Sequence, residues 1–209
     1  MNQENTTETA DKKPQSLASS IFDYMEIFVF AAVVVILLLT FGFRICVVDG
    51  PSMNNTLEEN ERLLISDLFY TPEYGDIVVF HQTGDDERLN KPIVKRVIAT
   101  GGQYVKIDYA KKLLYVSDDA VFDESDIKDE GSYAYFSGNY WRSSVGKDST
   151  LGQAVTKGIQ VPEGQLFVMG DNRNDSLDSR SDKIGFVDEH RVLGRVILRL
   201  TPFAKFGSV

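Results

Sequence analysis

One apolar segment constrains this chain more than any other feature. The residues from Ile27 to Phe43 read IFVFAAVVVILLLTFGF, 17 residues without a charge. As an α-helix they would span about 26 Å, close to the roughly 30 Å hydrocarbon core of a bilayer. Thirteen of them are Ile, Leu, Val or Phe, which favours membrane insertion by on the order of 5 kcal/mol. We therefore predict a transmembrane anchor over residues 27–43, extended by Ile45–Val48 if Arg44 snorkels to the interface.

Two alternatives to an anchor stay open. A buried core helix is equally apolar, although no polar stripe along this run is available to face solvent. A cleavable signal peptide has an apolar core of only about 7–15 residues and ends in a small-residue A-x-A site. Neither property fits this run or the Arg-Ile-Cys-Val-Val-Asp segment that follows it. We expect a retained, single-pass anchor in the cell membrane.

The orientation of the anchor is not fixed by charge. Two lysines precede it and two arginines follow it closely, so the positive-inside rule does not decide. The simpler arrangement places residues 1–26, a polar tail without periodicity at its start, in the cytoplasm. Residues 44–209 then form an extracytoplasmic domain.

Composition excludes several kinds of site. The net charge is −9, from 22 basic and 31 acidic residues, and no basic block is present to bind the phosphates of a nucleic acid. The single Cys46 cannot form an intramolecular disulfide, and its apolar neighbours argue against a catalytic thiol. With only two histidines, no Cys/His metal set can be built, and no EF-hand spacing is found. We expect neither a metal nor a cofactor.

The part of the chain after the anchor is predicted to be mainly β. Its apolar residues come in strand-length runs rich in Val, Ile, Tyr and Phe, separated by Gly, Asp and Asn. No run longer than about ten residues shows helical periodicity. Residues 105–109 and 114–116 are typical of a hairpin. The predicted strands are Leu63–Ile65, Ile77–Phe80, Ile93–Ile98, Tyr104–Ile107, Lys112–Val116, Gln165–Met169 and Val192–Leu200.

Residues 117–157 differ in composition from the rest of this domain. Seven acidic residues between Asp118 and Glu130 precede the aromatic stretch GSYAYFSGNYWRSS. A structureless loop of this length is uncommon in a compact domain, so we expect a small inserted subdomain. The predicted fold is an N-terminal transmembrane helix followed by a β-rich domain that carries this insertion.

Ser52 is the candidate nucleophile, because Gly50 and Pro51 directly before it indicate a tight turn that presents its hydroxyl near the membrane. A serine hydroxyl is a poor nucleophile until a base takes its proton. One candidate base is a histidine held by a carboxylate. However, His81 and His190 are expected at the surface, and no G-x-S-x-G elbow is present.

Lys95 is the stronger candidate base. In a strand, Ile93, Lys95, Val97 and Ala99 share one face, so the lysine stands among apolar residues. Desolvation there lowers the pKa of the amine towards the range of a useful base. The alternative is an ordinary strand charge that reaches water, as expected for Arg96, which has apolar neighbours on both sides.

A third polar segment, Gly170–Arg180, reads GDNRNDSLDSR. Glycine followed by Asn and Asp residues is typical of a turn held by hydrogen bonds from side chains to the backbone. Asp178 and Arg180 could pair across a bend. A plain solvated turn is the alternative.

Together these segments resemble the bacterial type I signal peptidases, or leader peptidases, which are membrane-anchored serine proteases with a Ser-Lys dyad. The single anchor is similar to that of the Gram-positive members. The matching segments occur in the family's order: Ser52-Met53 with Thr56-Leu57, Gly75–Phe80, Lys95–Ile98, and Gly170–Arg173 with Ser176, Asp178, Ser179 and Arg180.

The resemblance implies a role for each matched residue. Ser52 would attack the scissile carbonyl, and its backbone N–H would donate to the oxyanion. Neutral Lys95 would take the hydroxyl proton and return it to the leaving amine. Ser176 would orient the lysine, and Asp178 and Arg180 would form a supporting salt bridge. No cofactor is implied.

The substrate implied by the resemblance is the signal peptide of an exported preprotein, with small residues at the first and third positions before the cut. An extended peptide would add alongside strand 77–80 or its neighbours, with alternate side chains in shallow pockets. Met53, Ile77 and Val79 are the predicted substrate-binding residues.

Three positions depart from the family pattern. Asn55 stands where the family usually has proline, and Gly50 stands where some members have a serine hydroxyl as second oxyanion donor. Gly101-Gly102-Gln103 replaces a common Pro-Gly-Asp turn.

Core packing is expected for four aromatic residues that would otherwise contact the membrane interface, namely Phe69, Tyr70, Phe203 and Phe206.

Two other functions stay open. A non-catalytic, membrane-anchored chaperone or assembly factor of the same family is the main alternative, and the presence of both Ser52 and Lys95 argues against it. A Ser-Lys autopeptidase that cuts its own chain is the other, and the membrane anchor argues against it.

Overall fold

The computed structural model describes residues 17–82, 90–131, 133–135 and 149–209. The chain divides into two compact units, Met1–Phe41 and Gly42–Val209. Residues 1–16 of the predicted tail, and residues 132 and 136–148 of the predicted insertion, lie outside the described part.

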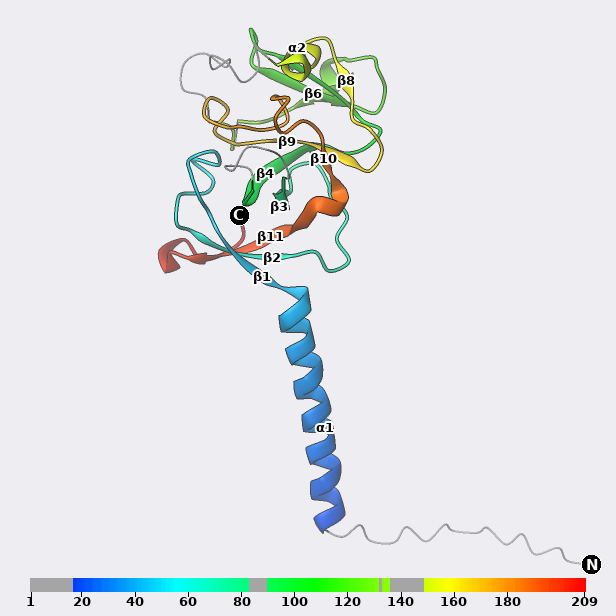
Figure 1. Cartoon of the computed structure of the whole chain (residues 1–209), viewed down its shortest axis with the longest axis vertical. Helices are drawn as coiled ribbons and strands as arrows, with labels where there is room; N and C mark the ends of the chain where they lie inside the picture. The colour runs from blue at the N-terminus through cyan, green and yellow to red at the C-terminus, as the bar shows by residue number, and fades with distance from the viewer. Residues whose placement is uncertain (1–16, 83–89, 132, 136–148) are drawn as a thin grey trace, which may run out of the picture. The chain divides into compact units, whose positions relative to one another are not determined.

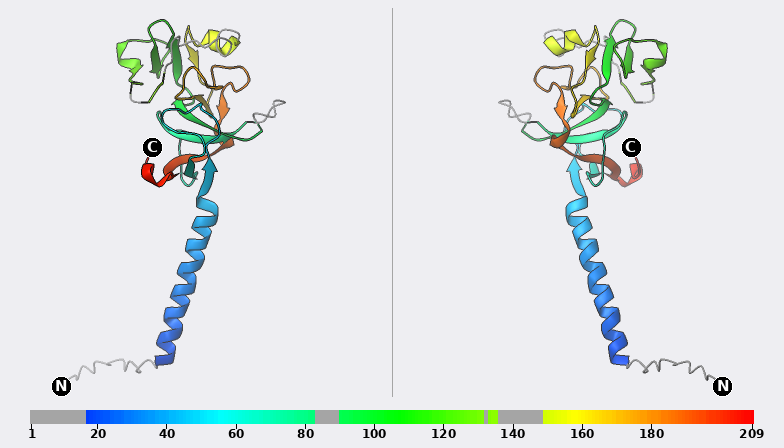
Figure 2. Two further views of the ribbon diagram at one scale, coloured as in Figure 1. Left: turned by 90° about the vertical axis from the view of Figure 1, so that its left-hand side faces the viewer. Right: turned by 90° about the vertical axis from the view of Figure 1, so that its right-hand side faces the viewer.

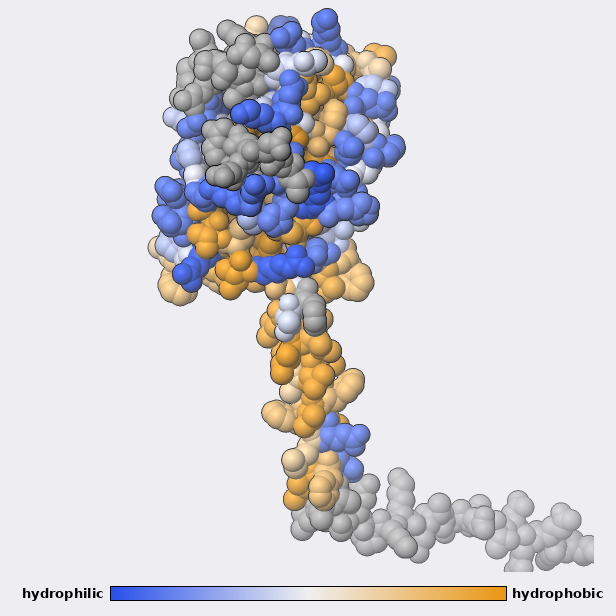
Figure 3. Space-filling view, viewed as in Figure 1, coloured by the Kyte–Doolittle hydropathy of each residue, from blue (hydrophilic) through white to orange (hydrophobic). Residues whose placement is uncertain are grey.

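The first unit is a long apolar helix. The α-helix α1 spans Leu17–Leu37 and continues into a π-helical turn, η1, at Leu38–Gly42. The helix therefore begins ahead of the predicted anchor and takes in residues 17–26, which were expected to belong to the tail. The segment Ser20–Thr40 is long and apolar enough to cross a membrane, and none of it is buried by the rest of the chain. Apolar residues cover most of its visible face (Figure 3), which does not fit the alternative of a buried core helix.

The residues after Arg44 do not prolong this helix. Arg44–Val47 form strand β1, which pairs antiparallel with β2, Arg62–Ser66. The expectation that Ile45–Val48 extend the membrane span is therefore wrong. The β-branched side chains of this stretch favour a strand, and β2 supplies the partner that a strand needs.

The second unit is built on a seven-stranded sheet in which every neighbouring pair is antiparallel. Its strand order is β1-β2-β11-β3-β4-β9-β10 (Figure 1). The mainly β fold predicted from the sequence is confirmed. The strands not yet defined are β3 Ile77–His81, β4 Pro92–Ala99, β9 Gln165–Met169, β10 Val187–Asp188 and β11 Val192–Thr201.

A smaller, four-stranded sheet has the order β7-β6-β5-β8. Its strands, coloured from green to yellow, lie at the top of both views in Figure 2. The predicted hairpin is formed by β5, Tyr104–Asp108, and β6, Leu113–Ser117. Two short strands from the predicted insertion complete the sheet, β7 Ile127–Lys128 and β8 Ile159–Gln160. The smaller sheet therefore combines the hairpin of residues 104–117 with two strands from the predicted insertion. The remaining short helices are η3 Glu124–Asp126, α2 Thr150–Ala154, η4 Glu189–Arg191 and η5 Phe203–Lys205.

Apolar side chains pack on both faces of the larger sheet. Alternate residues of β3 point to opposite faces, so Val79 belongs to a cluster with Met53 and Leu57, whereas Val78 packs with Val97 of β4. The segment that carries Ser52 is thus held on the sheet by the buried side chain that follows it, Met53.

The core-packing expectation is wrong for three of the four aromatic residues. Phe69 is 99% exposed, Phe203 is 85% exposed and Phe206 is 59% exposed. Only Tyr70 packs against a core cluster. All three exposed rings lie in connections or at the end of the chain, where no neighbouring strand covers them.

Candidate active site

Ser52 lies in the connection between β1 and β2, which is closed at its base by backbone hydrogen bonds. The amide of Val48 donates to Glu61 O at 2.9 Å, and the amide of Asn60 donates to Val48 O at 2.9 Å. Inside this loop, Met53 and Leu57 are buried. The two anchored side chains fix the backbone on one side of Ser52, which is itself half-buried and reachable from outside.

Lys95 lies in β4, and the structure brings its amine to the Ser52 hydroxyl. The distance from Lys95 Nζ to Ser52 Oγ is 2.8 Å, and Nζ also donates to Val94 O at 2.9 Å. The residue is only 3% exposed. The alternative of an ordinary strand charge that reaches water is therefore wrong.

The environment of this amine makes it easier to deprotonate than an exposed lysine. Burial lowers the pKa of Lys95 to about 8, and the charges of Asp178 and Asp171 oppose that effect only in part. Roughly a tenth of the molecules would then carry a neutral amine at pH 7. A hydroxyl in hydrogen-bond contact with such an amine meets the geometric and the acid–base requirement for activation.

Most of the Gly170–Arg180 segment is buried, with Asp175 as its exposed residue, so the alternative of a solvated turn is wrong. Asp178 is fully buried and receives two hydrogen bonds of 2.8 Å from the Arg180 guanidinium. The amide of Gly170 donates to the same carboxylate at 3.0 Å. Although burial alone would raise it, the pKa of Asp178 is lowered by Arg180. Asp178 and Arg180 thus form a buried ion pair beside Lys95.

Ser176 and Gly170 lie where the segment around Ser52 meets this turn. A side chain at Gly170 would collide with Ser176 Oγ and come within 2.5 Å of Ser52 O. Ser176 is buried. Among the described residues, the hydrogen-bond partners of Lys95 Nζ are Ser52 and Val94, and no bond links it to Ser176.

Two further contacts, not predicted from the sequence, link the turn to the segment around Ser52. The Arg96 guanidinium binds both oxygens of Asp171 at 2.8 and 2.7 Å, and Asp171 accepts a hydrogen bond of 2.6 Å from Thr56 Oγ1. Asn172 donates from its backbone to Ser52 O at 3.0 Å and from its side chain to Pro51 O at 3.1 Å. Apolar residues on both sides of Arg96 were the available signal, since a buried arginine needs a buried carboxylate.

A cavity of about 380 Å³ opens beside Ser52 and Lys95. One wall is formed by residues 48–53 and the other by the first half of β4. An ion pair between Lys91 and Asp49 joins the two walls. Of the predicted substrate-binding residues, Met53 lines the cavity, whereas Ile77 and Val79 lie in the core behind it. The other lining residues are Val48, Gly50, Pro51, Pro92, Ile93, Val94 and Leu177.

The β4 edge beside this cavity is open. Strand β9 pairs with β4 only between Arg96 and Ala99, and the described residues provide no strand partner on that side for Pro92–Lys95. By contrast, β3 is flanked by β11 and β4. A peptide strand therefore cannot pair with residues 77–80 themselves, but it can pair with the neighbouring strand β4.

The remaining candidates from the sequence lie away from these contacts. His81 and His190 are exposed, and neither is among the hydrogen-bond partners of Ser52 in the described part of the chain. Within the described residues, no cluster of His, Cys, Asp and Glu could hold a metal ion.

Known proteins are similar to this chain in sequence. A profile of the signal peptidase family, peptidase S26, matches residues 21–201. A signal peptidase I from Bacillus licheniformis is 31% identical over 196 residues, which cover 92% of this chain and 95% of that protein. The chain belongs to the S26 signal peptidase family.

Two further relatives extend the comparison. A signal peptidase IB from Staphylococcus aureus (strain Mu50) is 32% identical over 165 residues, 76% of this chain and 78% of that one. A crystal structure of a signal peptidase I from Enterococcus faecalis V583 superimposes with a TM-score of 0.40 at 28% identity, covering 60% of this chain and 97% of that chain. As an S26 signal peptidase with an N-terminal apolar helix, the protein is membrane-anchored.

Proposed function

We propose that this protein removes signal peptides from exported preproteins, with Ser52 as nucleophile and Lys95 as general base. The observation that carries the proposal is the 2.8 Å contact between the buried Lys95 amine and the Ser52 hydroxyl. The cavity beside that pair supports it, because it leaves room for a substrate on the side from which the hydroxyl can be reached.

The reaction needs one proton shuttle. Neutral Lys95 accepts the Ser52 proton while Oγ bonds to the scissile carbonyl carbon, and the resulting ammonium gives its proton to the leaving amine as the peptide bond breaks. The acyl group then stays on Oγ. A water molecule, deprotonated in turn by Lys95, attacks this ester, and the proton returns to Ser52 as the signal peptide leaves.

Charge on the carbonyl oxygen requires donors near Ser52. We assign one to the Ser52 backbone N–H, a type of interaction worth about 3–4 kcal/mol. Gly50 supplies no hydroxyl as a second donor. Its φ of 89° lies in the left-handed region, where a serine in its place would be strained.

The substrate segment would lie along the open β4 edge. Its backbone would pair with residues 92–95, and its alternate side chains would enter the cavity walled by Ile93, Met53 and Leu177. A cavity of about 380 Å³ shared by these positions suits small side chains near the cut.

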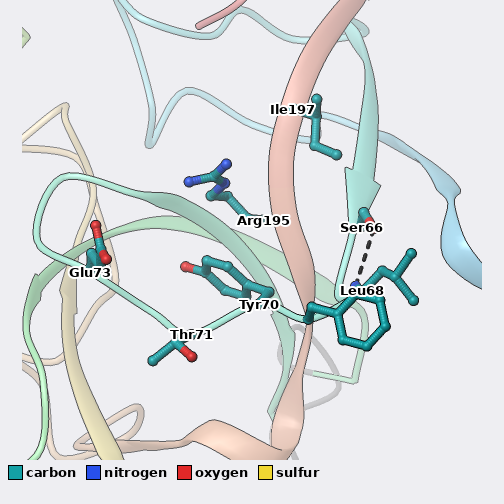
Figure 4. A pocket seen from close by; sticks show the side chains of 8 residues that line it. Ser66, Leu68, Tyr70, Thr71, Glu73, Arg195 and Ile197 are labelled. Carbon is teal, nitrogen blue, oxygen red and sulfur yellow. Dashed lines mark hydrogen bonds between the residues drawn. The ribbon is translucent and has the colours of Figure 1, made fainter.

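The second unit has exposed apolar residues in the loop after β2. Leu68 at the start of this loop is exposed. The same loop carries the exposed Phe69 and borders a cavity lined by Tyr70, Arg195 and Ile197 (Figure 4). We infer that this loop touches the outer bilayer surface, with the domain extracytoplasmic and the tail cytoplasmic, because an exported preprotein presents its cleavage site on that side.

The proposal is tested by cleavage in proteoliposomes. The substrate is a preprotein with an Ala-x-Ala site, and the product is identified by N-terminal sequencing for the wild type and for Ser52→Ala. A single cut after the second alanine, absent in the variant, is expected. Failure of the wild type to cut, where a control signal peptidase succeeds, would contradict the proposal and favour the chaperone alternative.

A further inference from the structure

One short segment of the subdomain built from the predicted insertion lies against the turn that adjoins Ser52 and Lys95. This segment, Glu130–Tyr135 without the undescribed residue 132, follows β7 and lies against the back of the turn that begins at Gly170. Tyr135 forms a parallel bridge with Asn172. The amide of Tyr135 donates to Asp171 O at 2.7 Å, and the amide of Arg173 donates to Tyr135 O at 3.0 Å.

Side chains reinforce this backbone contact. Glu130 forms an ion pair with Arg173, and both side chains are buried, with 6% and 0% exposure. Arg173 Nε in turn donates to Gly170 O at 3.1 Å. A buried charge of this kind is costly unless it is paired, so Glu130 and Arg173 need each other in this geometry.

Tyr133 covers a second arginine. The Arg96 guanidinium carbon lies 4.1 Å from the centre of the Tyr133 ring, and the Arg173 guanidinium carbon lies 5.7 Å from it. The Tyr133 hydroxyl is 2.9 Å from the Tyr74 hydroxyl. Stacking on an aromatic face fixes the plane of a guanidinium, and the plane of Arg96 determines where Asp171 is held.

From Asp171 the chain of contacts continues to the nucleophile. Asp171 accepts a hydrogen bond from the Thr56 hydroxyl, and the backbone amide of its neighbour Asn172 donates to Ser52 O. Arg96 is also the residue that follows Lys95 on β4. The segment therefore supports both members of the pair, Ser52 through the turn and Lys95 through the strand.

We propose that Glu130–Tyr135 is a positioning element for the signal peptidase reaction, and that Tyr133, stacked on Arg96, is its principal positioning residue. The inference rests on the proposed function. It gives the subdomain a role in the geometry of the cut.

Three variants test the proposal in the full-length, membrane-reconstituted protein. Tyr133→Leu removes the ring, Tyr133→Phe keeps the ring but loses the hydroxyl, and Phe122→Leu is the matched control. Phe122 makes its ring contact to Tyr115, 6.2 Å away within the smaller sheet. The measurements are kcat and KM for an Ala-x-Ala preprotein, with the thermal midpoint of each variant.

A small misplacement of reacting groups lowers the rate on the order of ten- to a hundredfold. We expect a loss of this size in kcat for Tyr133→Leu, an unchanged KM, and a thermal midpoint close to that of Phe122→Leu. Tyr133→Phe should restore most of kcat. The acid limb of the rate profile should also move to lower pH in Tyr133→Leu, because a displaced Asp171 no longer raises the pKa of Lys95.

Two results would overturn the inference. One is wild-type kcat in Tyr133→Leu, and the other is an equal loss in Tyr133→Leu and Phe122→Leu that follows their thermal midpoints. Both leave the proposed function intact, since they presuppose that the wild type cuts. If the wild type does not cut, the proposed function fails instead.

Discussion

Lys95 Nζ lies 2.8 Å from Ser52 Oγ, although the two residues are 43 positions apart in the chain. The contact joins a loop at one edge of the larger sheet to a strand near its middle, and the buried Asp178–Arg180 pair lies beside it. An amine that is buried and in contact with a hydroxyl is suited to accept a proton from it.

Replacement of Lys95 by methionine should abolish turnover and leave the fold intact. Methionine fills a similar volume but cannot accept a proton, whereas the core clusters around β4 remain unchanged. Lys111→Met is the matched control, because Lys111 is an exposed lysine in the β5–β6 turn. The measurement is preprotein cleavage by the two variants, and circular dichroism shows whether both are folded. Normal turnover by Lys95→Met would exclude Lys95 as the base.

The same variant should reveal the cost of burying the amine. The pKa of Lys95 falls from 10.5 to about 8 on folding, so between these values the unfolded state binds more protons than the folded state. Stability of the wild type relative to Lys95→Met should therefore rise by about 3 kcal/mol from pH 8 to pH 10.5. Urea unfolding of both proteins across this range measures the difference. A pH-independent difference would show that the lysine is solvated in the folded state.

Gly170→Ala should inactivate the protein. The added methyl would overlap the Ser176 hydroxyl and press on Ser52 O, and displaced reacting groups lower the rate by on the order of a hundredfold. Gly42→Ala is the control, because its new Cβ meets only Leu68 at an ordinary 3.7 Å. Cleavage rates of the two variants are compared at equal substrate. Full activity in Gly170→Ala would mean that the two segments are not in close contact.

The strands and the pairing of Ser52 with Lys95 could be predicted from the sequence, but the burial of the polar turn could not. Period and composition indicate β3, β4 and the hairpin. The apolar neighbours of Lys95 did not distinguish it from Arg96, and the resemblance to the signal peptidases did. The Gly170–Arg180 segment looks like a solvated turn because the hydrogen-bond partners of its polar side chains are distant in the sequence. Asp171 finds its partner Arg96 at a separation of 75 residues. No local pattern records such a pairing.

The aromatic residues were expected to be buried, and three of them are exposed instead. Phe69 looks like core material by composition, yet it lies in the β2–β3 connection with nothing packed over it. Local composition does not distinguish a ring that packs inside from one that faces a bilayer, since both environments favour it.

Contact of Phe69 with lipid can be measured by fluorescence quenching. We expect Phe69→Trp, in a protein whose single tryptophan Trp141 is replaced by phenylalanine, to be quenched by brominated phospholipids in nanodiscs. Val121→Trp in the same background is the control, since Val121 is 73% exposed in the connection after β6. Equal quenching of the two tryptophans, or none for Phe69→Trp, would contradict membrane contact by this loop.

The most direct test of the account is the pH dependence of kcat/KM for an Ala-x-Ala preprotein between pH 5 and pH 10. If neutral Lys95 activates Ser52, the rate should rise through a single ionisation near the pKa of about 8 that burial gives this amine, and then level off. A profile governed by an ionisation near about 6.5, the ordinary value for histidine, and abolished by removal of His81 or His190, would contradict the Ser-Lys pair.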